Sequence, residues 1–233
     1  MYQWLLTIQS YRHLVLLVSI FVMFFAQLVV HGFVGGQIIY DILVTIVMMI
    51  VLFVVFQRKH ERYWALAIAV PGILTRWGAH GVPADYQWMV HLGHQALIVI
   101  FFAFAVGVIL RGIYAERVIT VDHLVGTVCG YILAGAAFGN CYQITEFMLP
   151  GSFDIVPRAA WQLQHEHSRS FLFTSFSLAT MTGATFNDMT PIRPAMGSLV
   201  WMEVLFGQFY LAVVVAQLVS LKLTQVAEPV EEP

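Results

Sequence analysis

Apolar residues occur in long runs along this chain, separated by short polar segments that carry most of its charges. A helix that crosses a bilayer needs about 20 mostly apolar residues. This pattern predicts six membrane-spanning helices, over residues 14–30, 38–56, 63–74, 91–110, 121–143 and 196–221. The third segment is short and contains Pro71-Gly72, so we expect it to be kinked or to continue past its apolar limits.

A half-length segment, residues 168–180, lies between the last two predicted spans and is rich in Ser, Thr and Phe. The preceding residues, 143–167, predict a loop because Pro150-Gly151 and Pro157 interrupt regular structure. A helix over 168–180 is too short to cross a bilayer and is followed by Gly183 and a returning helix. We therefore expect a re-entrant loop, whose non-helical backbone must be buried in protein or line a water-filled cavity.

Composition supports a multi-pass membrane protein with an all-α fold. Of 233 residues, 60% are hydrophobic and 10% are charged, whereas a soluble domain carries about 25% charged residues. The net charge of −2 gives no reason to expect a nucleic-acid partner. Cys129 and Cys141 fall in one predicted helix, about 18 Å apart along its axis, which excludes a disulfide between them.

The distribution of basic residues predicts the orientation of the helices, because Lys and Arg concentrate in cytoplasmic loops. Most basic residues fall before the first predicted span or after the second, fourth and sixth: Arg12, Arg58, Lys59, Arg62, Arg111, Arg117 and Lys222. We therefore expect both termini in the cytoplasm and the chain in the inner (plasma) membrane. The predicted organisation is a four-helix unit over 1–117, a pore domain over 118–222 and a disordered acidic tail over 223–233.

Residues 171–221 resemble the pore domain of the potassium-channel superfamily. The run Asp188-Met189-Thr190-Pro191 looks like the family's exit from the selectivity filter, and residues 203–213 are similar to inner helices of small bacterial members. The resemblance implies a homotetramer in which an outer helix, a pore helix, a filter and an inner helix surround a four-fold axis. It also implies filter residues at Thr182, Gly183, Ala184, Thr185, Phe186, Asn187 and Asp188.

The centre of this segment departs from the family pattern Thr-Val-Gly-Tyr-Gly-Asp. Only Asp188 matches exactly, and Phe186 keeps an aromatic ring without its hydroxyl. Family filters align backbone carbonyls to replace the ion's hydration shell, and glycine readily adopts the conformations that this needs. Thr185 is β-branched and resists positive φ. We therefore predict a wider filter that is not potassium-selective and is lined by threonine hydroxyls and carbonyls.

Asp188 has two interpretations. Four Asp188 carboxylates at an outer mouth would favour cations; alternatively, Asp188 caps the turn through Thr190-Pro191 and pairs with Arg193. Glu203, an ionisable group inside the sixth span, either hydrogen-bonds behind the filter and supports it or lines a cavity. Gly207, one turn later, is either a gating hinge or a position of close helix packing.

The remaining polar residues favour few other functions. Residues 96–110 contain no basic residue, which argues against a voltage sensor. Asp41 is a candidate partner for Arg76 or a histidine. His91, His94, His165 and His167, with His80, are weak candidates for a zinc or pH-sensing site, and the alternative is an interfacial belt with Trp77, Trp88 and Trp161.

No catalytic motif is present in the sequence, so we expect neither an enzyme nor a cofactor. The favoured function is a tetrameric channel in the lipid bilayer for monovalent or divalent cations. The alternative is a channel-like membrane sensor or scaffold that does not conduct, with Phe186 sealing the former ion path.

Overall fold

A computed structural model describes residues 12–30, 35–115, 120–164, 166–184, 186 and 188–227. In this part of the chain, seven α-helices form an all-α fold. They are α2 (Arg12–Val30), α3 (Gly36–Val54), α4 (Lys59–Gly78), α5 (Ala84–Ala115), α6 (Val121–Met148), α7 (Glu166–Thr182) and α8 (Pro194–Ala227). Short elements near the last two helices are β1 (Phe153–Ile155), η2 (Ala160–Gln164) and β2 (Met189–Pro191), and η1 (Ala79–Gly81) follows α4.

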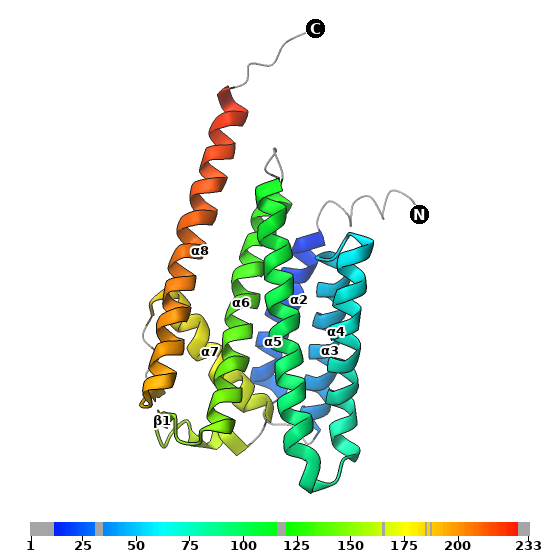
Figure 1. Cartoon of the computed structure of the whole chain (residues 1–233), viewed down its shortest axis with the longest axis vertical. Coiled ribbons are helices and arrows are strands. Elements are labelled where there is room, and N and C mark those ends of the chain that lie inside the picture. The colour runs from blue at the N-terminus through cyan, green and yellow to red at the C-terminus, as the bar shows by residue number, and fades with distance from the viewer. Residues whose placement is uncertain are drawn as a thin grey trace.

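Six of these helices run along the length of the bundle, and α7 is shorter (Figure 1). The start of α2 and the end of α8 lie at one end, which we call the terminal end. The starts of α7 and α8 lie at the opposite end, the loop end, together with β1 (Figure 1). Each helix predicted from the apolar pattern is present in the structure.

Among the described residues, four helices are long and apolar enough to cross a membrane: α3, α5, α6 and α8. The length and the apolar composition of these helices therefore indicate a membrane-embedded protein. The third predicted span is more polar than the others, because α4 continues beyond its apolar part to include Lys59, Glu61, Arg62 and Arg76. It contains Pro71 and still forms one helix of 20 residues.

Most helices extend a few residues beyond the expected boundaries, and the C-terminal ends of α6 and α8 show why. The fifth predicted span was expected to end at residue 143, but α6 continues to Met148, because the first helix breakers are Pro150-Gly151. The tail was expected from residue 223, but α8 continues to Ala227, since Pro229 is the first breaker there. Residues 228–233 lie outside the described part of the chain.

The core has two parts. A larger apolar cluster fills the bundle of α2 to α6. A smaller aromatic cluster lies at the loop end, where Phe153 of β1 packs edge-on against Tyr142 of α6 and against Phe173 and Phe176 of α7. Edge-on aromatic pairs stabilise such a cluster beyond the burial of their area. This second cluster fixes the loop before α7 to the helices beside it.

Ion pairs and hydrogen bonds connect helices inside the bundle. Arg76 of α4, one of the partners expected for Asp41, forms a buried ion pair with it across to α3 and lies over the ring of Tyr40. It also donates to Nε2 of His94 on α5 at 3.1 Å. Burial of these charges is tolerated because they are paired and hydrogen-bonded.

Glycines let α7 approach its neighbours closely. A Cβ at position 139 of α6 would lie 2.8 Å from the Cα of Thr174, and one at position 135 would meet Leu178 at 2.5 Å. On the other side, a Cβ at position 207 of α8 would lie 2.6 Å from the carbonyl oxygen of Met181. Small residues give membrane helices this kind of backbone contact. The structure thus gives Gly207 a packing role.

We expect Gly207→Ala to destabilise the protein by about 1–3 kcal/mol, the usual cost of inserting a methyl group where the neighbouring backbone cannot yield. The measurement is the denaturation midpoint of the purified protein. Gly197→Ala is the control on the same helix, because a Cβ there meets nothing within 4 Å. Equal midpoints for the two variants would contradict this packing role.

Candidate functional site

The predicted filter segment begins where α7 ends, halfway along its neighbours. Gly207, which faces Met181, lies 13 residues after the start of α8, about 20 Å along the helix. Gly135, which faces Leu178, lies near the middle of α6. Figure 1 shows α7 running inward from the loop end and the chain then returning to that end, where α8 begins. The end of α7 therefore lies at mid-height of the two apolar helices.

A glycine cap ends α7. Gly183 has a φ of 74°, its N–H donates to the carbonyl of Thr180 at 3.1 Å, and the N–H of Ala184 donates to the carbonyl of Ala179 at 2.8 Å. These two bonds form the Schellman motif, in which glycine adopts the left-handed conformation at low cost. Gly183, a predicted filter residue, is thus also the cap of the helix.

The threonine at the end of α7 is also part of the helix. The hydroxyl of Thr182 lies 3.0 Å from the carbonyl oxygens of Leu178 and Ala179, so its proton is directed back toward α7. Thr182, Gly183 and Ala184 are exposed in the single chain. Thr185 and Asn187, also predicted in the filter, lie outside the described residues.

Phe186 belongs to the margin of the aromatic cluster. Its ring packs edge-on against Phe176 of α7, with 6.1 Å between the ring centroids. The ring is partly buried, and the helix that it contacts is α7 of the same chain. The aromatic character of this position is therefore used in packing against α7.

The C-terminal end of the predicted filter segment is held by an ion pair and by the hydrogen bonds of a short two-stranded sheet. The carboxylate of Asp188 accepts from Nε of Arg158 at 2.9 Å, and Nη2 of Arg158 lies 2.9 Å from the same oxygen. The expected partner, Arg193, instead donates to the carbonyl of Pro150, because the loop between α6 and α7 folds over the start of α8. The pairing of Asp188 with Arg193 is thus wrong.

Backbone hydrogen bonds position the exit of the segment. Strand β2 pairs with β1 in antiparallel register, with Asp154 opposite Thr190 and Ile155 opposite Met189. The carbonyl of Asp188 also accepts from the N–H of Val156 at 3.1 Å. Met189 is buried in the aromatic cluster, which anchors the ladder.

Glu203 is the central polar residue behind this segment. It is completely buried on α8, and its carboxyl oxygens lie at hydrogen-bond distance from the hydroxyls of Tyr142 on α6 and Ser177 on α7. The Ser177 hydroxyl also contacts the carbonyl of Gly135 at 2.6 Å. Glu203 therefore connects α6, α7 and α8, which agrees with the supporting role rather than with a cavity-lining one.

The number of protons in this cluster indicates that Glu203 is protonated. Ser177 has a single proton and two neighbouring acceptors, the Gly135 carbonyl and the Glu203 carboxyl group. If Glu203 donates to Ser177, then Ser177 donates to Gly135 and Tyr142 donates to the second carboxyl oxygen, so each group is satisfied. With an ionised carboxylate, the two close oxygen contacts of Ser177 would share a single proton, and a charge would be buried.

The histidines do not form a metal site in the described structure. Nδ1 of His94 lies 3.0 Å from the Gly72 carbonyl and Nε2 lies 3.1 Å from Arg76, so both ring nitrogens are used within the core. The ring of His91 contacts the ring of Phe147 in a tilted arrangement. His165 and the side chain of His167 lie outside the described residues. Among those described, no three His, Cys, Asp or Glu side chains are grouped to hold a metal ion.

Several partners of the site were missed by sequence reasoning. Tyr142, Ser177 and Arg158 are ordinary residues in their segments, and no local pattern assigns them to Glu203 or Asp188. Gly135 and Gly139 did carry a signal, because two small residues four positions apart in a membrane helix favour close packing. The chain matches no family model, and no curated protein or solved structure was found to be similar to it.

We expect Glu203→Gln to cost less than about 1 kcal/mol of stability, because an amide can donate to Ser177 and accept from Tyr142 as the protonated acid does. Glu203→Leu should cost about 1–3 kcal/mol, since both hydroxyls lose their partner. Denaturation midpoints test this, and infrared spectra should show a protonated carboxylic acid that Glu203→Gln removes. Tyr86→Phe, at an exposed ring, is a neutral control.

A large loss of stability in Glu203→Gln, equal to that of Glu203→Leu, would contradict the protonated state. So would the absence of the carboxylic-acid band from the spectrum of the native protein.

Proposed function

We propose that the chain is the subunit of a homotetrameric, six-span, pore-loop cation channel, with both termini in the cytoplasm. Ions would pass along the four-fold axis, through residues 182–188 and between the α8 helices. The single observation that supports this most is that non-helical backbone follows α7 at mid-height of α6 and α8. The altered filter would conduct monovalent or divalent cations without selecting potassium.

The position of this backbone requires water or further protein around it. Thr182, Gly183 and Ala184 are exposed in one chain, and the contact of Met181 with Gly207 places them near the middle of the apolar α8 segment, Pro194–Gln217. In a hydrocarbon environment, unsatisfied backbone groups cost several kcal/mol each. A cavity shared between subunits would hydrate this backbone, whereas a single chain surrounded by lipid would not.

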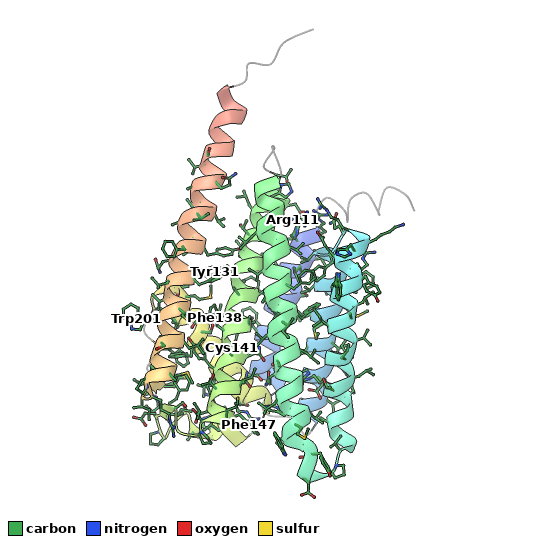
Figure 2. The ribbon with its side chains drawn as sticks, viewed as in Figure 1. Arg111, Tyr131, Phe138, Cys141, Phe147 and Trp201 are labelled. Atoms are coloured by element: carbon green, nitrogen blue, oxygen red, sulfur yellow. The ribbon has the colours of Figure 1, made fainter. Side chains whose placement is uncertain are left out.

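Helix α8 has a surface suited to assembly. Only 22% of its candidate span is buried in one chain, against 39–50% for α3, α5 and α6. Large apolar side chains at positions 201, 205 and 209 are exposed along one stripe of the helix. Figure 2 shows Trp201 pointing away from the other helices. Packing between copies would use this surface, and the C-terminal end of α7 would direct partial negative charge toward a cation.

The ion pair at Asp188 modifies the expected electrostatics of the outer mouth. Four Asp188 carboxylates would lie beside four Arg158 guanidinium groups, which offset their charge. Arg158 is 71% exposed at its side chain, so water and salt weaken the pair. The Asp188 ring would attract cations less than unpaired carboxylates do, which is consistent with weak selectivity.

We expect Asp188→Asn to lower, and Arg158→Gln to raise, cation over anion permeability by about two- to fivefold, the effect of an exposed charge interaction of less than about 1 kcal/mol. The measurement is the reversal potential of reconstituted protein in a concentration gradient of a single salt. Asp154→Asn, on β1 of the same loop, is the matched carboxylate control. Unchanged permeability ratios in both test variants would exclude Asp188 from the mechanism.

The non-conducting sensor or scaffold stays the alternative. Folded, tetrameric protein that passes no ions at any voltage, pH or divalent concentration would support it over the channel. A dimeric assembly in lipid would also contradict the four-fold pore.

A further inference from the structure

A second site lies at the loop end, away from the predicted filter. A cavity of about 290 Å³ opens between α5, α6, α7 and the loops beside them. Ligand pockets in proteins have volumes from about 300 Å³ upward, so this cavity suits a small molecule. Its lining combines His91, Gln143, Glu146 and Arg169 with four apolar side chains, Phe147, Pro150, Leu163 and Phe173. Figure 2 shows Phe147 at the loop end of α6.

Two residues that line this cavity carry buried hydrogen-bond donors without acceptors among the described residues. Nε2 of Gln143 is one of them, and the residue is only 4% exposed. Its carbonyl oxygen is already used, because it accepts from Gln95 and Ser170 at 3.2 Å each. The second donor is Nε of Arg169, at the start of α7. Buried donors without partners are costly, so an acceptor that these side chains turn toward in the cavity would stabilise the protein.

The nearby carboxylate does not supply that acceptor. Both oxygens of Glu146 accept backbone N–H groups of the loop, from Gly151 at 2.8 Å, Ser152 at 2.9 Å and Phe153 at 3.2 Å. Glu146 therefore holds the loop that forms one wall of the cavity. Its negative charge also makes the cavity unfavourable for an anion with two charges.

We propose that this cavity binds a monocarboxylate with a short apolar body. One carboxylate oxygen would accept from Arg169 and the other from Gln143, while the hydrocarbon part would contact Phe147, Leu163 and Phe173. Guanidinium groups bind carboxylates through strong charge-assisted hydrogen bonds. The same headgroup occurs on small soluble acids and on fatty acids of the membrane. This site does not depend on ion conduction by the chain.

Equilibrium dialysis of labelled hexanoate against the full chain in lipid nanodiscs tests the site. We expect saturable binding, with hexanamide bound at least about tenfold more weakly, because a hydrogen bond to a charged group is worth about that factor or more. This comparison needs no variant. Inorganic phosphate should fail to displace hexanoate. Equal binding of hexanamide, displacement by phosphate at the concentrations at which butanoate displaces, or no saturable binding would overturn the proposal.

Variants locate the site. Arg169→Gln should weaken hexanoate binding by about tenfold or more, and Arg169→Lys should retain part of it, because lysine keeps the charge without the planar donors. Arg111→Gln, which removes a guanidinium group at the terminal end, should bind as the native chain does. Native affinity in Arg169→Gln, with native helical content, would overturn the assignment.

Chain length distinguishes the two sources of the headgroup. A small soluble acid is indicated if affinity rises from butanoate to hexanoate and falls at dodecanoate, because the cavity volume limits the apolar body. A membrane fatty acid is indicated if dodecanoate competes best, with its tail extending into the lipid. Both results support a carboxylate site and differ only in the occupant.

Discussion

The carboxyl group of Glu203 connects three helices that the chain brings together from distant positions. Through Tyr142 and Ser177 it fixes α8 to both α6 and α7. Polar side chains between these apolar helices have few other hydrogen-bond partners. A buried polar group restricts the positions of its neighbours, because any arrangement that leaves it without a hydrogen bond is costly. The tilt of α7, and hence the depth at which the predicted filter begins, depends on this cluster together with the glycine contacts beside it.

The segment after α7 is held at both ends by ordinary backbone hydrogen bonds. The Schellman motif fixes its start at Gly183 and Ala184, and the ladder between β1 and β2 fixes its exit. Neither anchor uses the side chains that distinguish a potassium filter. The path of the chain on either side of the segment is therefore held independently of the side chains inside the segment.

The sequence predicted the helices well because apolar length and helix breakers are local properties. It also offered Arg76 or a histidine as the partner of Asp41, and close packing as one of two roles for Gly207. It failed where partners are distant: Asp188 pairs with Arg158 instead of Arg193, and nothing near Tyr142 or Ser177 indicates that they meet Glu203. The glycine cap at Gly183 was not predicted, because the resemblance implies ion coordination at this position, which also ends a helix.

Helix α8 is one continuous helix without proline after Pro194, and it projects beyond the other helices at the terminal end (Figure 1). Its contact with Met181 at Gly207 divides it into arms of 13 and 20 residues, about 20 and 30 Å long. With that contact as fulcrum, a sideways movement of about 3 Å at Ala227 would move Pro194 by about 2 Å in the opposite direction. A helix that pivots as a unit about this contact would transmit a displacement of the terminal end to the strand pair at the loop end.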